Sequence, residues 1–379
     1  MILELNEQQR MIKNMVREFA EKEVKPKAAE LDEKEEYPEL ALKKMAQLGI
    51  LGTIIPQEYG GAGLDNVTYA TVIEEISRAC ASTGVVTSVH NSLASWPIMT
   101  YGTEEQKKKY LPILAKGEKI GAFGGTEPNA GSDLGAMQST AELKGDKYII
   151  NGTKTFITSG PKAGIIIAFA VTNKELGPKG LSAFIVESDF KGFSVGGIFD
   201  KIGINASLTS ELVFEDMEVP KENLLGKEGD GFKIALSTLD GGRIGIAAQA
   251  VGIAQAALDE SVEYSKSRQQ FGRPIAKFQA IQWMLSEMAT SIEAARYLVL
   301  NAAYYKDQGR RISKEAAMAK LFAAETAVDV TNKAIQIHGG YGYTKEYPVE
   351  RLYRDARITG IYEGTSEVMK MVISGALLK

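Results

Sequence analysis

The spacing of apolar side chains divides the 379-residue chain into three segments, and the first segment has the period of a helix. In EQQRMIKNMVREF the apolar residues recur at spacings of three and four, which predicts a buried stripe on one helical face formed by Met11, Ile12, Met15, Val16 and Phe19. The stretch PELALKKMAQLG begins with proline and ends with glycine, the usual asymmetry of helix ends. Similar patterns continue to about residue 115, so we predict an N-terminal helical domain over residues 1–118.

The period then shortens to two between about residues 120 and 225. The stretch STAELKGDKYIINGTKTFITSG alternates apolar and polar residues, with turn signals at Gly145-Asp146 and Asn151-Gly152. Four more short apolar runs follow between turn residues: GIIIAFAV, LSAFIVES, GFSVGGI and TSELVFEDMEV. Strands in succession without intervening helices favour an antiparallel sandwich or barrel over βαβ units. We therefore predict a middle β domain over residues 119–226.

The last segment is helical again, and its predicted helices are long. GDGFKIALSTLDGGRIGIAAQAVGIAQAALDESVEYSKSR spans about 40 residues, far above the mean helix length of about 11 to 12. Its many alanines and glycines suit close packing of neighbouring helices. FQAIQWMLSEMATSIEAARYLVLNAAYYKDQG and SKEAAMAKLFAAETAVDVTNKAIQIHGG indicate two further helices. The pattern predicts an α+β multidomain protein that ends in a helical bundle domain over residues 227–379.

Charge and hydropathy narrow the class of protein. Lysine and arginine number 44 against 48 acidic residues, a net charge of -4, so no basic surface of the kind that binds nucleic acid is expected. Charges recur through the first 19 residues, which is unlike a signal peptide. Apolar runs are too short to cross a bilayer. We expect a cytoplasmic protein that binds neither nucleic acid nor membrane.

Scarce cysteine and histidine limit the chemistry. A single cysteine, Cys80, excludes an intramolecular disulfide and fits a reducing compartment. With only His90 and His338 besides, a structural zinc site is not expected, and neither histidine lies near a nucleophile motif. Glycine-rich dinucleotide and Walker-type phosphate motifs are absent. Carboxylates, backbone amides and a bound organic cofactor remain as the means of catalysis.

Four motifs occur in a fixed order along the chain. They are FGGTEPNAGSD (123–133) followed by FIT (156–158), LDGGR (239–243), SRQQFGRPIAKFQAIQ (267–282), and QIHGGYGYTKEYPVERLYRDARI, which runs on into IYEGTSE. Together they resemble the acyl-CoA dehydrogenase family of flavoproteins over essentially the whole chain, nearest to bacterial short-chain (butyryl-CoA) dehydrogenases. The resemblance implies that family's fold: an N-terminal all-α domain, a middle antiparallel β domain and a C-terminal four-helix bundle.

The stretch IYEGTSEV by itself reads as a surface turn before a last helix. The resemblance instead makes Glu363 the base that removes the α-proton of an acyl-CoA, giving the trans-2-enoyl-CoA. Water exclusion would raise the pKa of such a carboxylate and make it a stronger base. Gly364 would let the substrate approach the backbone closely. By the same resemblance the substrate site also includes Ser132, Asp240, Arg243 and Tyr362.

The resemblance implies FAD as the cofactor, with N5 accepting the β-hydride. Implied contacts within one subunit are Phe123, Thr126, Ser132, Phe156, Ile157, Thr158, Thr365 and Glu367. Implied contacts from a neighbouring subunit are Arg268, Phe271, Gln279, Gln336, Gly339 and Gly340, which makes a homotetramer the expected assembly. Without the resemblance, residues 126–132 read as a tight turn, Phe156 as a core aromatic residue, and the stretch around Arg268 as a solvated helix end.

Some positions refine the resemblance. Certain relatives carry their base on the long helix, where this chain has Gly242, so Glu363 and a short- or medium-chain straight acyl group are the better match. Gly125 and Asn205 depart from the family pattern, which usually has an aliphatic residue and an arginine there. Electrons are expected to pass to an electron-transferring flavoprotein. The alternatives are a flavin oxidase or monooxygenase of the same fold, and a scaffold that binds acyl-CoA without turnover.

Overall fold

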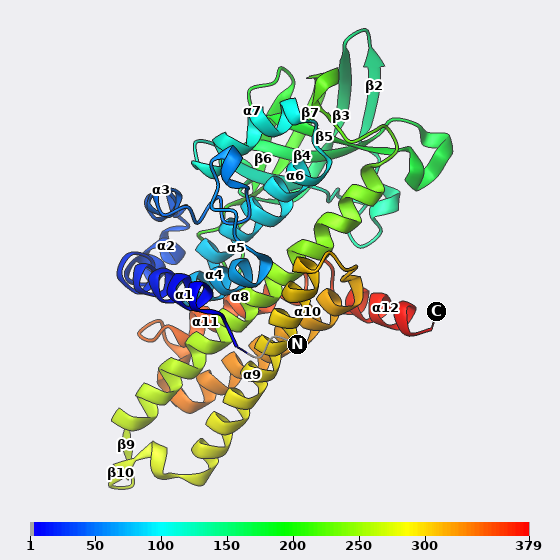
Figure 1. Cartoon of the computed structure of the whole chain (residues 1–379). Coiled ribbons are helices and arrows are strands. Elements are labelled where there is room, and N and C mark those ends of the chain that lie inside the picture. The colour runs from blue at the N-terminus through cyan, green and yellow to red at the C-terminus, as the bar shows by residue number, and fades with distance from the viewer. Residues whose placement is uncertain (1–3, 379) are drawn as a thin grey trace.

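The computed structural model describes residues 4–378 and begins with a helical segment that extends to Ala115 (Figure 1). Its α-helices are α1 (Glu7–Phe19), α2 (Ala28–Lys34), α3 (Glu39–Gln47), α4 (Asn66–Ala79), α5 (Ala81–Ser88), α6 (Trp96–Tyr101) and α7 (Glu104–Ala115). Capping boxes begin α1 at Asn6 and α7 at Thr103, where the side chain accepts a hydrogen bond from the backbone three residues on. A π-helical turn, Val89–Ser95, joins α5 to α6.

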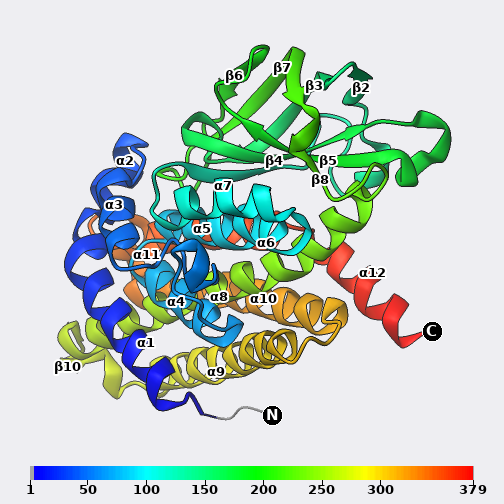
Figure 2. The ribbon, with the colours of Figure 1, turned by 45° about the horizontal axis from the view of Figure 1, so that its top comes forward.

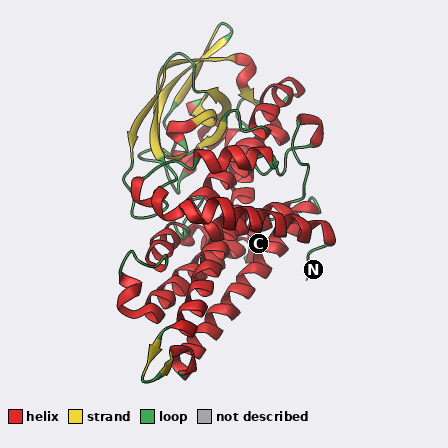
Figure 3. Cartoon of the chain, turned by 90° about the vertical axis from the view of Figure 1, so that its left-hand side faces the viewer, coloured by secondary structure: helices red, strands yellow, loops and turns green. Residues whose placement is uncertain are grey.

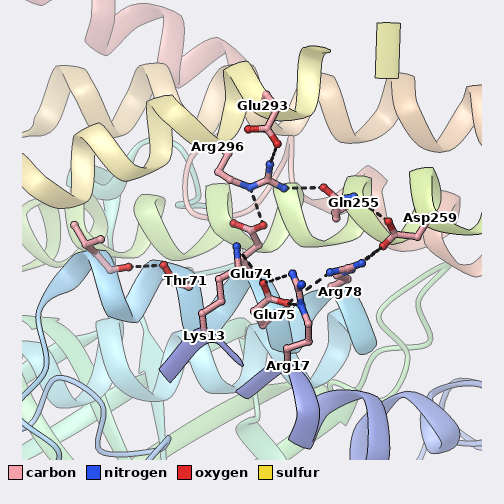
Figure 4. A network of polar contacts seen from close by, with 11 residues as sticks. Lys13, Arg17, Thr71, Glu74, Glu75, Arg78, Gln255, Asp259, Glu293 and Arg296 are labelled. Carbon is pink, nitrogen blue, oxygen red and sulfur yellow. Dashed lines mark hydrogen bonds and ion pairs between the residues drawn. The ribbon is translucent and has the colours of Figure 1, made fainter. Parts of the chain in front are cut away.

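Helix α1 is held by part of its predicted apolar stripe, since Ile12, Val16 and Phe19 join a core cluster, and by charge. Val16 is fully buried, but Met11 and Met15 are 67% and 38% exposed. Arg17 donates two hydrogen bonds to the buried carboxylate of Glu75 on α4, at 2.9 and 2.8 Å. Figure 4 shows how this network continues across α4 to α8 and α9. Apolar spacing alone did not reveal that charged contacts, rather than the methionines, face the core.

The middle segment forms one eight-stranded sheet of mostly antiparallel strands. Its strands are β1 (Ile120–Gly124), β2 (Thr140–Lys144), β3 (Lys147–Thr158), β4 (Ala163–Val171), β5 (Leu181–Glu187), β6 (Phe193–Ile198), β7 (Thr209–Pro220) and β8 (Leu224–Leu225). The order is β6-β7-β3-β2-β4-β5-β8, with β1 paired to β4. The pairs β1–β4 and β2–β4 are parallel, unlike the purely antiparallel sheet that was predicted.

Asn151-Gly152 is not a turn, contrary to the sequence prediction. Both residues lie inside β3, where the register with β7 shifts between Ile150 and Gly152. Asn151 exchanges side-chain and backbone hydrogen bonds with Asp216 across this irregularity. An Asn-Gly pair within a strand can therefore mark a bulge as well as a hairpin.

The C-terminal segment is helical apart from one small hairpin. Its elements are α8 (Gly231–Ser267), β9 (Gln269–Gln270), β10 (Arg273–Pro274), α9 (Gln279–Asp307), α10 (Ser313–His338), α11 (Val349–Ile358) and α12 (Ser366–Leu377). Helix α8 packs against α10, α9 and α4, so it belongs to the cores of both helical segments. Figure 3 shows the β9–β10 hairpin at the end of the molecule opposite the sheet.

Glycines on α8 let the N-terminal and C-terminal helical segments approach each other closely. A Cβ at Gly245 would lie 2.2 Å from the hydroxyl oxygen of Ser88, and one at Gly252 would lie 2.4 Å from the carbonyl oxygen of Glu74. In Figure 2, α5 to α7 lie between the sheet and the long helices. Of the helices in residues 4–378, none has the length and apolarity that crossing a membrane requires.

Candidate active site

The motif IYEGTSEV forms a sharp corner between α11 and α12. Two consecutive residues in this corner have positive φ, 52° at Glu363 and 103° at Gly364. Thr365 ends the corner as the N-cap of α12, with its hydroxyl accepting a hydrogen bond from the Val368 N–H at 3.2 Å. Positive φ is costly for a residue with a side chain, so neighbouring groups must hold Glu363 in this conformation.

The carboxylate of Glu363 is directed into the protein. The residue as a whole is partly exposed, yet both carboxylate oxygens are buried and have no hydrogen-bond partner among residues 4–378. One oxygen occupies space that a side chain on α8 would need, since a Cβ at Gly242 would lie 2.1 Å from it. Burial raises the pKa of Glu363 to about 8, against the opposing effects of Lys320 and Arg243. A buried, unpartnered carboxylate of raised pKa suits proton abstraction.

Four of the five predicted substrate residues lie close to Glu363 or to its direct contacts, whereas Ser132 lies in the middle domain. Arg243 contacts the carbonyl oxygen of Glu363 through Nε at 3.5 Å and pairs with Asp240 at 2.7 Å. The hydroxyl of Tyr362 donates to the side-chain oxygen of Gln249 on α8. The carbonyl oxygen of Gly364 accepts a hydrogen bond from Lys320 Nζ at 2.6 Å. Asp240, Arg243, Tyr362 and Gly364 therefore lie around one site.

The motifs FGGTEPNAGSD and FIT lie side by side in the middle domain. The Thr155 N–H donates to the Thr126 carbonyl at 2.9 Å, and Lys154 Nζ pairs with Glu127 at 2.7 Å. Lys154 is fully buried and Glu127 nearly so. This pair holds the loop that carries Thr126 against the strand that carries Phe156.

Side chains of the two motifs differ in orientation. Phe156 has φ 56°, is 63% exposed and packs on Phe199 with ring centroids 4.6 Å apart. Thr158 is half-buried and Ser132 is exposed. Ile157 lies in the core of the sheet, so only its backbone can face a cofactor. Phe156 is therefore not an ordinary core aromatic residue.

The two departures from the family pattern have local structural explanations. A Cβ at Gly125 would lie 2.5 Å from Cε1 of Phe123, so the Phe123 ring occupies the space of the missing side chain. The amide nitrogen of Asn205, turned toward the carbonyls of Lys201 and Gly203, lies 2.8 and 3.1 Å from them. Asn205 can thus brace its own loop.

Most of the remaining predicted cofactor residues lie at the opposite end of α8. A cavity of about 480 Å³ is lined by Arg268, Gly339 and Gly340. Phe271, 93% exposed with φ 51°, lies in the β9–β10 loop, while Gln279 and Gln336 are exposed on α9 and α10. Figure 1 shows this hairpin far from α12, which begins after Thr365 and carries the exposed Glu367. One chain therefore presents two separate groups of predicted residues.

His338 also lines this cavity and has a packing role. Its ring stacks on Tyr264 with centroids 4.1 Å apart, and its Nδ1 lies 2.8 Å from the carbonyl oxygen of Ala334. Nε2 is buried and has no partner in the part of the chain that the structure describes. Arg268 lies over Tyr341 at 5.6 Å, so the cavity combines aromatic surfaces with a cation.

Sequence analysis missed two buried lysines. Lys320 lies on α10 within the alanine-rich stretch EAAMAKLFAAETA, and Lys154 lies on β3 between Thr153 and Thr155. Both side chains are fully buried. A single lysine on an otherwise apolar face was the signal, since a buried charge requires a partner. Within residues 4–378, no group of three His, Cys, Asp or Glu side chains is arranged to hold a metal ion.

Comparisons with known proteins identify the family of this chain. Three family models match the chain in order: the acyl-CoA dehydrogenase N-terminal domain at residues 6–118, the middle domain at 122–217 and the C-terminal domain at 229–378. The short-chain specific acyl-CoA dehydrogenase of Clostridium acetobutylicum is 58% identical over 375 residues, which cover 99% of both chains.

Two solved structures are similar along their whole length. Butyryl-CoA dehydrogenase from Megasphaera elsdenii has a TM-score of 0.98 and 48% identity, covering 100% of both chains. A chain from "Electron transferring flavoprotein of Acidaminococcus fermentans: Towards a mechanism of flavin-based electron bifurcation" has a TM-score of 0.99 and 55% identity, also covering 100% of both. The predicted fold class is confirmed. The chain belongs to the acyl-CoA dehydrogenase family and is an oxidoreductase of that family.

Proposed function

We propose that this enzyme converts a short- or medium-chain acyl-CoA to the trans-2-enoyl-CoA, with Glu363 removing the α-proton. The observation that carries the proposal is the buried, unpartnered carboxylate of Glu363 next to Gly242. A carboxylate shielded from water is a stronger base than one in solution, which narrows the acidity gap to a thioester α-proton. The similarity to a short-chain specific enzyme and to a butyryl-CoA dehydrogenase supports a short straight acyl group.

The residues present fit FAD. The exposed ring of Phe156, on the strand that is bonded to the loop at Thr126, offers an aromatic face for a flavin ring. The cavity at Arg268 offers a cation for a pyrophosphate, since a guanidinium pairs well with phosphate oxygens. When bound, FAD would supply the acceptor for the β-hydride through its flavin ring. The protein supplies the base, a dry site and the orientation of the thioester.

Assembly and electron transfer extend this proposal. The Arg268 cavity lies far along α8 from Glu363, so a second subunit is proposed to complete the FAD site, in a homotetramer. Electrons are proposed to leave through an electron-transferring flavoprotein. The similar chain from the Acidaminococcus fermentans work on such a flavoprotein supports this partner.

An anaerobic titration with acyl-CoAs of increasing chain length tests the reaction. Butyryl-CoA should bleach the flavin absorbance of the holoenzyme, and enoyl product should appear in equal amount. Rapid peroxide formation by the reduced enzyme in air would favour an oxidase instead. A colourless protein that takes up no FAD would favour the non-catalytic scaffold.

Arg268→Ala should weaken retention of FAD. The guanidinium is the cation among the residues lining the cavity, so its loss removes a charge-assisted contact worth about 1.5 to 3 kcal/mol, or roughly 10- to 100-fold in Kd. FAD release during gel filtration and calorimetric titration of the apoenzyme would measure the change. Arg310→Ala, a solvent-exposed arginine near the end of α9, is the matched control. Equal FAD affinity in the two variants would contradict the assignment of Arg268.

A further inference from the structure

The strongest unassigned group near Glu363 is the buried amine of Lys320. Its side chain comes from α10 and is 0% exposed. Nζ donates to the carbonyl oxygen of Gly364 at 2.6 Å, directly after the residue that carries the base. Burying a lysine costs free energy of desolvation unless its charge is paired or hydrogen-bonded. The hydrogen bond to Gly364 must therefore offset part of that cost at this corner.

The corner itself explains why such a contact is needed. Positive φ at both Glu363 and Gly364 persists only if the surroundings hold the backbone in place. The two successive carbonyl groups face two buried cations from different long helices: Arg243 of α8 contacts the carbonyl of Glu363, and Lys320 of α10 binds that of Gly364. Rotation of either peptide group would break one of these contacts.

We propose that Lys320 is a positioning residue for the base: by binding the Gly364 carbonyl it keeps the Glu363 carboxylate in the slot beside Gly242. This inference rests on the proposed function only in that Glu363 is taken as the base. Glu363 makes no hydrogen bond of its own through its carboxylate to any residue in 4–378, so its direction is set by the backbone. Lys320 therefore acts on the reaction through Glu363 and needs no contact with the substrate.

The charged groups around Glu363 provide a way to test the inference, because replacing Lys320 should change the pKa of Glu363. The groups that interact with Glu363 are Arg243 on α8, Lys320 on α10, Tyr69 on α4 and the neighbouring Tyr362. Asp240 pairs with Arg243, and Glu367 of α12 acts on Lys320. Burial raises the pKa of Glu363, while Lys320 and then Arg243 lower it. A neutral residue at 320 removes one of the two cations, so the pKa of Glu363 should rise further.

The test compares Lys320→Met with Lys333→Met in the holoenzyme. Lys333 lies on the same helix, is partly exposed and pairs with Asp329 and Glu287. Lys320→Met should lower kcat by about 10- to 100-fold, as expected when a reacting group is displaced by about 1 Å, with KM nearly unchanged. The rising limb of the pH profile should move up by about one pH unit. Lys320→Arg, which keeps the charge and the donors, should recover part of the rate.

A second readout does not depend on turnover. The infrared C=O stretch of protonated Glu363 can be isolated as the difference from Glu363→Gln in the FAD-loaded protein without substrate. Lys320→Met should keep this band to higher pH than wild type. If Lys320→Met displaces the band in this way but wild type turns over no acyl-CoA, the proposed function fails while the role of Lys320 stands.

Unchanged kcat, pH profile and infrared band in Lys320→Met would overturn the inference. Should Lys320→Met fail to fold, Lys320→Leu gives the same decision, because it also removes both the charge and the donor. A lowered kcat with a displaced infrared band and pH profile in Lys320→Leu supports the positioning role, and wild-type values for all three overturn it.

Discussion

Glu363→Gln is expected to abolish bleaching of the flavin by acyl-CoA while leaving FAD bound. An amide cannot accept the α-proton, and general-base catalysis contributes about 10²- to 10⁴-fold. Gln nearly preserves the volume of the side chain, so the slot beside Gly242 stays filled. Stopped-flow absorbance under anaerobic conditions measures the rate. Glu325→Gln, an exposed carboxylate on α10, is the matched control.

The same substitution should stabilise the folded protein near pH 8. Because the pKa of Glu363 is raised from 4.5 to about 8, the folded state holds this proton more tightly than the unfolded state. The contribution to stability is therefore full below about pH 4.5 and is lost as the pH rises toward 8. A tenfold difference in proton affinity between the folded and unfolded states is worth about 1.4 kcal/mol, so the total is a few kcal/mol. Thermal unfolding at pH 5.5 and 8.5 should show Glu363→Gln gaining relative to wild type at both pH values, and gaining more at the higher one.

Two results would contradict the role of Glu363. Bleaching at the wild-type rate in Glu363→Gln would remove this residue as the base. An identical pH dependence of thermal unfolding in the variant and wild type would mean that the carboxylate is not held in a dry slot. The pair of measurements separates the chemistry of Glu363 from its environment.

Periodicity was sufficient for the order of helical and β segments because their apolar positions repeat over many residues. Periodicity gave the wrong local structure where ion pairs or strand pairing, not apolar burial, determine it. Met11 and Met15 have helical spacing, yet the ion pairs of Glu75 orient α1. Asn151-Gly152 has the letters of a turn, yet pairing with β7 continues through it as a bulge. A short motif such as Asn-Gly shows only that unusual backbone conformations are accessible. Pairing with the neighbouring strand determines whether a turn or a bulge forms.

The candidate site was predictable only in part for a similar reason. The motif placed Glu363 at a corner, but the slot depends on the missing side chain of Gly242, which is 121 positions earlier in the chain. Lys320 and Lys154 act through contacts with residues far away in sequence. A lysine in an alanine-rich or alternating segment indicates a buried charge, but the residue that pairs with it cannot be predicted from the segment.

Glu127→Gln is expected to cause the largest loss of stability among the substitutions considered. Burial alone would raise the pKa of Glu127, but Lys154 and the N–H groups around it outweigh burial, and the net pKa is lowered. The carboxylate accepts the N–H groups of Gln138 and Ser139 as well as Lys154 Nζ at 2.7 Å. Removing its charge leaves a fully buried ammonium without a counterion, which costs about 3 to 5 kcal/mol.

An exposed pair that also involves β3 provides the control for this effect. Lys147 of β3 pairs with Glu218 of β7 at 2.7 Å, with side chains 47% and 30% exposed, so Glu218→Gln should change the stability little. Chemical denaturation should place Glu127→Gln well below Glu218→Gln, and adding Lys154→Met should recover part of the loss because the stranded charge is gone. FAD affinity should fall with Glu127→Gln, since the pair joins the Thr126 loop to the strand of Phe156. Equal midpoints for the two single variants would mean that the buried pair does not hold this loop.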